Sequence, residues 1–246
     1  MSLLSVRDVT LRFGGITALE DVSFDVEEAT TAGLIGPNGA GKTTTFNVVT
    51  RLYRLDAGDV LMDERSLLRT PPSRIIRHGI ARTFQNAQPF ATMTVLENVL
   101  VGAHAGSRFE RERSVRRRAL EALELIDVAE FADHPAAGLP FGTLKRIELA
   151  RALVSKPRLL LLDEPAGGLN HAEVEELAEL LGRIRKELNV TLLLVEHHMG
   201  LVMKLSDHVN VLNFGRLIAS GPPEEIQKNP EVIEAYLGGE LEETAA

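Results

Sequence analysis

The stretch Gly36-Pro37-Asn38-Gly39-Ala40-Gly41-Lys42-Thr43 decides the fold of this chain. It matches the pattern G-x-x-x-x-G-K-[ST] and lies between an apolar segment that ends at Ile35 and a predicted helix over residues 43–52. Glycines let backbone N–H groups surround phosphate oxygens, and a helix N-terminus adds a favourable dipole. The stretch therefore predicts a phosphate-binding loop; an incidental glycine turn with a lysine is the weaker alternative in this setting.

Two side chains of this loop have distinct expected tasks on a nucleoside triphosphate. Lys42 would bridge the β- and γ-phosphates, and the Thr43 hydroxyl would hold Mg²⁺. The residues that we expect to bind the nucleotide here are Gly36, Pro37, Asn38, Gly39, Ala40, Gly41, Lys42, Thr43 and Thr44.

A second chemical anchor is the run Leu159-Leu160-Leu161-Leu162-Asp163-Glu164. Its apolar part is typical of a strand buried on both faces, and such a strand delivers its carboxylates to the sheet edge where ligands bind. Asp163 suits Mg²⁺, directly or through water, and Glu164 can polarise the water that attacks the γ-phosphate. Two acids after a strand can also simply begin a helix, but behind a phosphate-binding loop this alternative is weak.

Strands and helices alternate along most of the chain. Residues 22–26 alternate apolar with polar, and residues 190–195 form another apolar run, whereas residues 114–128, 144–154 and 174–188 carry apolar side chains at helical spacing. This order predicts an α/β fold with a mostly parallel core sheet, an antiparallel β subdomain and a helical subdomain. We expect one domain over residues 1–246, in which residues of about 91–155 form the helical part and about 1–90 and 156–246 the rest.

Composition narrows the class of protein. The chain has 246 residues and no cysteine, so it cannot form disulfides. Its formal net charge of -8 argues against a nucleic-acid partner. No segment approaches the ~20 apolar residues of a membrane span, and no signal peptide is evident. Six arginines between Arg108 and Arg118 predict the solvated face of a helix, with contact to a partner or to lipid headgroups as the alternative.

The two anchors and the motifs between and after them resemble those of the ATP-binding-cassette (ABC) family, and the resemblance extends over residues of about 3–239. The family's Q-loop resembles Arg82-Thr83-Phe84-Gln85. Its signature motif resembles Leu139-Pro140-Phe141-Gly142-Thr143, and its D-loop resembles Gly167-Gly168-Leu169-Asn170. The resemblance implies a P-loop NTPase of the ABC ATPase type with ATP and Mg²⁺ as cofactors.

The same resemblance implies further site residues. Gln85 would contact the metal and sense the membrane partner, and Gly142 would donate its N–H to ATP held by the opposite subunit. His197 corresponds to the switch histidine at the γ-phosphate, and Phe13 to the aromatic ring on adenine. Taken alone, Gln85 and His197 could be structural and Phe13 part of the core. The resemblance thus implies Glu164, His197 and Gln85 as catalytic residues, and Thr43, Gln85 and Asp163 as metal ligands.

A closer resemblance is to the branched-chain amino acid importer ATPases. It rests on Ile80-Ala81-Arg82-Thr83-Phe84-Gln85-Asn86, on Met93-Thr94-Val95-Leu96-Glu97-Asn98-Val99, and on the C-terminal run from Asn229 to Gly238. It implies a peripheral subunit on the cytoplasmic face of the cell membrane. Its partners would be transmembrane permease subunits, a second ATPase subunit that is either a copy or a paralogue, and indirectly a substrate-binding protein.

Several positions depart from the family pattern. Pro140 stands where the signature serine is usual, and Thr143 and Leu144 also differ. His198 replaces a common aspartate, His171 a common proline and Arg51 a frequent glycine. Since the phosphate, metal and water residues are kept, these changes concern turnover and partner choice more than ATP binding.

Other functions stay open at the level of sequence. Within transporters, a urea-import or lipopolysaccharide-export motor has a similar pattern. A soluble, non-transport ABC ATPase is a further alternative, although the single cassette and the acidic charge argue against it. A P-loop phosphotransferase or GTPase is disfavoured by the signature-like helix before Asp163.

Overall fold

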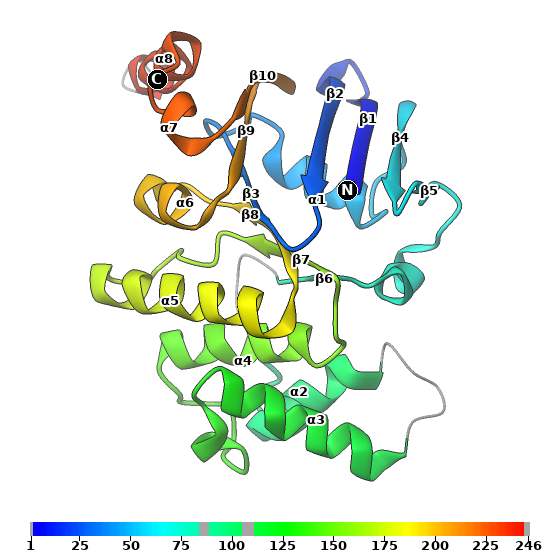
Figure 1. Ribbon diagram of the computed structural model, residues 1–246, viewed down its shortest axis with the longest axis vertical. Helices are drawn as coiled ribbons and strands as arrows, with labels where there is room; N and C mark the ends of the chain where they lie inside the picture. Colours follow the sequence, from blue (N-terminus) through cyan, green and yellow to red (C-terminus); the bar gives the residue numbers. More distant parts are fainter. Residues whose placement is uncertain (1, 84–88, 105–110, 244–246) are drawn as a thin grey trace. The chain divides into compact units, whose positions relative to one another are not determined.

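The computed structural model describes residues 2–83, 89–104 and 111–243 (Figure 1). It divides into two compact units, one formed by Met1–Ile75 with Thr191–Ala246 and the other by Ile76–Val190. Each unit is described by itself. The helical subdomain expected at about 91–155 is a finer division than this one, so its boundaries stay a prediction.

The first unit contains an antiparallel sheet with the order β2-β1-β4-β5. Its alternating side chains explain why it forms: Val22, Phe24 and Val26 are buried, and the residues between them are not. The long hairpin of the first two strands turns at Gly14 and Gly15. The strands are β1 (Ser2–Phe13), β2 (Ile16–Glu27), β4 (Ala57–Met62) and β5 (Arg65–Ser66).

Parallel strands form the second sheet region of this unit. Strand β3 (Thr31–Ile35) pairs in parallel with both β8 (Thr191–Val195) and β9 (His208–Asn213), and β10 (Arg216–Gly221) pairs antiparallel with β9. Every residue of β3 and β8 is buried, as expected for strands covered on both faces. Because parallel strands end at one edge, the residues that follow β3, β8 and β9 gather there.

Helix α1 of this unit follows the glycine-rich loop and is shorter than the sequence predicts. It spans Lys42–Val49, with Phe46 and Val49 fully buried as expected. Arg51 then adopts φ 63, the left-handed conformation in which helix ends favour glycine. The other helices are α6 (Met199–Leu205), α7 (Pro223–Ile226) and α8 (Pro230–Glu243).

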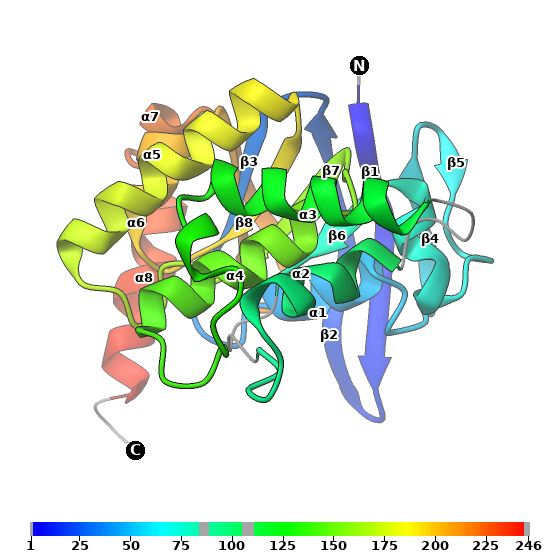
Figure 2. The same ribbon diagram turned by 90° about the horizontal axis from the view of Figure 1, so that it is seen from below.

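The second unit combines two parallel strands with a set of helices (Figure 2). Strand β6 (Ile80–Arg82) pairs in parallel with β7 (Leu159–Asp163), all of whose residues are buried. Helices α2, α3 and α4 pack on one another. The helices are α2 (Val95–His104), α3 (Glu112–Leu125), α4 (Phe141–Leu153) and α5 (His171–Leu188), and the 3₁₀ turns are η1 (Pro72–His78), which crosses the unit boundary, and η2 (Ala129–Phe131).

The described part of the basic cluster lies on α3. Val115 and Ala119 are buried on one side of this helix, whereas Arg113, Arg116 and Arg117 are exposed. This is the arrangement that an amphipathic surface helix predicts. In the part of the chain that the structure describes, no helix has both the length and the apolar content needed to cross a membrane.

Candidate functional site

The loop between β3 and α1 has the geometry of an anion cradle. Gly36, Gly39 and Gly41 have φ angles of 148, 77 and 104, in the region that side chains rarely adopt. A Cβ at Gly36 would also collide with the carbonyl oxygen of Leu212 on β9. The loop therefore needs glycine both for its conformation and for its close approach to the neighbouring strand.

Lys42 lies inside the curl of this loop. Lys42 is only 6% exposed, and its Nζ donates to the carbonyl oxygens of Gly36 at 2.7 Å and Pro37 at 2.8 Å. The ammonium group is thus held beside the backbone that forms the cradle. Thr43 is exposed and Thr44 half-buried on the first turn of α1.

The N-terminus of α1 is open to an anion. Gly41 is its N-cap, and among the described residues no side chain caps it and no acid stands in the first turn. Free N–H groups and the helix dipole favour negative charge at this point. Thr45 takes no part, because its hydroxyl donates to the Gly41 carbonyl oxygen at 3.0 Å.

His197 follows the strand next to β3. Leu34 of β3 lies opposite Val195 of β8, so His197 comes at the same sheet edge as the glycine loop, and it is exposed. The adjacent Glu196 is only 3% exposed, and its Oε2 accepts N–H bonds from His197 at 2.8 Å and His198 at 3.0 Å. A buried carboxylate thereby fixes the backbone that carries the histidine.

Phe13 lies at the tip of the β1–β2 hairpin and not in the core. It is 46% exposed, and its ring meets Tyr53 edge to face at a centroid distance of 5.1 Å. The structural alternative considered from sequence, a core phenylalanine, is therefore wrong. An exposed ring held by a second ring is suited to stacking on a flat ligand.

Tyr236 of α8 is a further group beside the loop. Burial raises the pKa of the Tyr236 hydroxyl to about 12, and its proximity to the Gly36 backbone lowers the pKa in part. The C-terminal helix thus places a neutral phenol next to the first glycine of the cradle.

In the second unit, Asp163 ends β7 and is 3% exposed. Its Oδ2 accepts a hydrogen bond from Arg82 Nη2 at 2.6 Å, and its N–H points at the Thr83 hydroxyl at 3.4 Å. Parallel pairing of β6 and β7 brings these residues together. The sequence-predicted metal ligand Gln85, which follows β6, lies outside the described residues.

Glu164 adopts a strained backbone conformation directly after the strand. Its φ is 49, and its carbonyl oxygen accepts bonds from Gly167 N at 3.1 Å and Lys145 Nζ at 3.2 Å. Non-glycine residues in this region cost about 1–3 kcal/mol and concentrate at functional sites. The half-buried Glu164 thus begins the turn that follows β7.

Helix α4 presents the signature-like segment. Pro140 is its N-cap, and in the described part of the chain no side chain caps it. The Phe141 ring packs against Gly168 of the D-loop segment, with Lys145 Nζ 5.5 Å from its centroid. Gly142 faces Glu173, whose Oε1 is 3.3 Å from the place that a Cβ on Gly142 would take.

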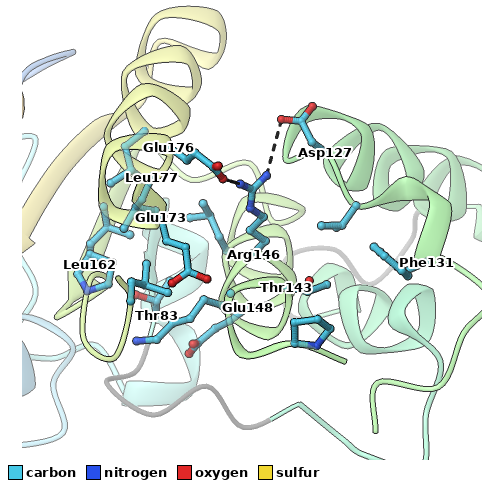
Figure 3. A pocket seen from close by; sticks show the side chains of 18 of the residues that line it. Thr83, Asp127, Phe131, Thr143, Arg146, Glu148, Leu162, Glu173, Glu176 and Leu177 are labelled. Atoms are coloured by element: carbon cyan, nitrogen blue, oxygen red, sulfur yellow. Dashed lines mark hydrogen bonds and ion pairs between the residues drawn. The ribbon is translucent and has the colours of Figure 1, made fainter. Parts of the chain in front are cut away.

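A pocket of about 310 Å³ opens beside this segment. Figure 3 shows Arg146 between Asp127 on one side and Glu176, Glu173 and Thr83 on the other. Its Nη2 donates to Glu176 Oε2 at 2.8 Å, and its Nη1 lies 3.9 Å from Asp127 Oδ2. Glu173 also joins Asn170 in the capping box that begins α5. Pro140, Gly142 and Thr143 of the signature-like segment line this pocket.

Sequence reasoning missed three of these residues. Arg82 stood in the quoted Q-loop run and Tyr236 in the quoted C-terminal run, both without a role, and Glu196 had no motif signal. The roles of these residues depend on strand pairing and on contacts between segments that are distant in sequence.

Comparisons with known proteins place the chain in a family. A family model described as "ABC transporter" matches residues 19–167, more than half of the chain. The chain belongs to the ABC transporter family. A second model, "Branched-chain amino acid ATP-binding cassette transporter", matches residues 216–242 of this ABC chain.

Curated relatives of this ABC chain agree over almost the whole length. The "High-affinity branched-chain amino acid transport ATP-binding protein BraF" of Pseudomonas aeruginosa is 44% identical, with 96% of this chain and 98% of the relative covered. The "High-affinity branched-chain amino acid transport ATP-binding protein LivG" of Escherichia coli is 43% identical, with 96% of this chain and 98% of the relative covered. A probable LivG of Archaeoglobus fulgidus is 37% identical, with 98% and 97% covered.

Solved structures confirm the ABC ATPase fold. An ATP-binding cassette of an ABC transporter in its ADP conformation has a TM-score of 0.89 at 30% identity, with 97% of this chain and 99% of that chain covered. A nucleotide-free cassette gives 0.88 at 29% identity, with 96% and 99% covered. The predicted family, the α/β fold of the ABC ATPase type and the ATPase class of enzyme are thereby confirmed.

Proposed function

We propose that this ABC ATPase is the motor of an importer for branched-chain amino acids. The single observation that supports nucleotide binding most strongly is the glycine cradle with Lys42 inside it. The solute is supported by the names of the relatives and by the C-terminal family model, because a motor subunit does not contact the solute itself.

The residues of the first unit fit a nucleoside triphosphate. Phe13 would stack on the base, the loop N–H groups would bind phosphate oxygens, and Lys42 would neutralise the β- and γ-phosphates. Glu196 would hold the backbone of His197, which would contact the γ-phosphate. The loop cradle that a Cβ would fill is the structural feature that fits this ligand.

The chemistry of the donors fits Mg²⁺ rather than a softer metal. Thr43 and Asp163 offer oxygen atoms, and Gln85 would add an amide oxygen. Among the described residues no cluster of three or more His, Asp or Glu side chains could hold a metal. This agrees with Mg²⁺, which usually takes one or two protein ligands together with phosphate oxygens and water. The metal, when bound, would neutralise charge that develops on the transferred phosphate.

Catalysis would depend on Glu164 and on a second subunit. Glu164 would polarise the attacking water, aimed by its left-handed backbone. The uncapped N-terminus of α4 at Gly142 would serve the ATP held by the other subunit, whether copy or paralogue. The permease subunits, and through them a substrate-binding protein, would complete an assembly on the cytoplasmic face of the membrane.

The change Glu164→Gln tests this function. It keeps the shape of the side chain but removes the charge that polarises water, so ATP hydrolysis should fall at least about a hundredfold while ATP affinity stays unchanged. Phosphate release and equilibrium binding of ATP measure the two quantities separately.

Glu179→Gln is the matched control, since Glu179 is an exposed acid on α5. It should hydrolyse ATP at the wild-type rate. Normal hydrolysis by Glu164→Gln would show that another group positions the water.

A further inference from the structure

Arg82 is a charged residue for which the mechanism above has no use. It ends β6, pairs with Leu161 across the parallel ladder, and reaches past it to the carboxylate that ends β7. The distance of 2.6 Å between Arg82 Nη2 and Asp163 Oδ2 is that of a charge-assisted hydrogen bond. The ladder itself therefore fixes the guanidinium beside the expected metal ligand.

The pair is almost excluded from water. The Arg82 side chain is 8% exposed and that of Asp163 is 4% exposed. Among the described residues no second hydrogen bond reaches the Asp163 carboxylate, and the backbone N–H of Asp163 donates to the Thr83 hydroxyl. A buried carboxylate is strongly unfavourable unless a cation accompanies it, so Arg82 supplies the charge that the folded chain needs there.

We propose that Arg82 is the built-in counter-ion that holds and neutralises Asp163 while no magnesium is bound, and that magnesium competes with it. The proposal rests on the function above only for the identity of the competing metal. Arg82 is a positioning residue, because it acts on the metal site through Asp163.

Electrostatics sets the direction of the effect. A guanidinium and Mg²⁺ on one carboxylate repel each other, and in the protein interior such repulsion is screened much less than in water. Arg82 thus stabilises the metal-free form and lowers the affinity for magnesium. Removal of Arg82 should therefore lower the stability of the metal-free form and raise the affinity for magnesium.

The first experiment needs no nucleotide. Urea unfolding in EDTA compares the wild type with Arg82→Met, Asp163→Asn and the double variant. Arg82→Met leaves a lone buried carboxylate, so its folding equilibrium constant should fall on the order of a hundredfold, and Asp163→Asn in the same chain should restore most of it. Additive losses would overturn the counter-ion role. Arg82→Lys keeps the charge and should stay within about tenfold of the wild type.

The second experiment measures magnesium directly. With ADP present, the midpoint of a magnesium titration followed by thermal unfolding should move to a concentration about three- to tenfold lower in Arg82→Met than in the wild type. Arg82→Lys, which folds with its charge in place, should keep the wild-type midpoint. An unchanged or higher midpoint in Arg82→Met would contradict competition.

Arg7→Met is the matched control, since Arg7 pairs with Asp25 at a similar 2.7 Å but with both side chains 42% exposed. It should change neither measurement by more than about twofold, because exposed ion pairs contribute little. If the wild type binds no ADP, the proposed function fails, whereas the coupling in EDTA still decides the role of Arg82.

Discussion

Lys42, at the first position of α1, and Asp163, at the end of β7, carry opposite charges, and each is nearly closed off from solvent. Each charge has a partner within the chain: backbone carbonyl oxygens surround Lys42, and a guanidinium meets Asp163. Buried charges are kept only with such partners. The two side chains are thus held in place before any ligand arrives, which is the property that a charge-neutralising site requires.

Tyr236 permits a prediction on pH. Burial raises its pKa to about 12 in the folded chain, whereas the ordinary value is about 10. The neutral phenol therefore stabilises the fold fully below pH 10, and this contribution is lost as pH rises towards 12. By pH 11, the wild type should lose about 1 kcal/mol more unfolding free energy than Tyr236→Phe does.

Urea unfolding at pH 8.5 and pH 11 measures the difference. Tyr53→Phe is the matched control, because Tyr53 is the second of the two tyrosines in the chain and is 37% exposed. It should follow the wild type at both pH values. Parallel losses in Tyr236→Phe and the wild type would show that this phenol does not titrate as its surroundings imply.

At the scale of elements, helix α6 shows how a departure from the family pattern is accommodated. His198 is its N-cap, and Nδ1 accepts the Leu201 N–H at 3.2 Å, at a helix position for which aspartate is among the preferred residues. His198→Ala should cost about 1 kcal/mol of unfolding free energy, whereas His198→Asp should match or exceed the wild type.

Chemical denaturation of both variants checks this, with His171→Ala as the control. His171 is exposed at the first position of α5, where the Asn170 and Glu173 box already caps the helix. Its loss should stay within about 0.5 kcal/mol. An aspartate variant as unstable as the alanine variant would mean that His198 is not a cap.

The departures at the other helix ends have equally local causes. His171 takes a position where proline is merely preferred, and Arg51 adopts the left-handed conformation itself. The Phe141 ring of the signature-like segment packs on Gly168, which joins that segment to the D-loop segment. The loop 36–43 and the strand end at Asp163 could be predicted from sequence because periodicity and spacing specify them locally.

What sequence could not predict depends on contacts between distant segments. Arg82 meets Asp163 only because β6 pairs with β7. Glu196 can hold the His197 N–H because the fold buries its carboxylate directly after β8. Tyr236 lies two hundred residues from Gly36 along the chain. Helix ends moved by a few residues, as at Phe141, because capping geometry and not apolar spacing decides them.

At the scale of the whole molecule, a ligand that binds only the folded chain stabilises all of it. ATP at about one hundred times its dissociation constant should add about 2.7 kcal/mol to the free energy of unfolding. For a chain of this size the unfolding temperature should rise by several degrees. Such stabilisation reports on binding without requiring hydrolysis, a membrane partner or a second subunit.

The most direct test of the account is therefore the rise in unfolding temperature that ATP with magnesium produces, measured against each variant's own nucleotide-free value. The wild type and Lys228→Met, which removes an exposed lysine, should both show the full rise, and Lys42→Met should lose nearly all of it. A full rise in Lys42→Met would contradict the claim that the loop of residues 36–43 binds the triphosphate.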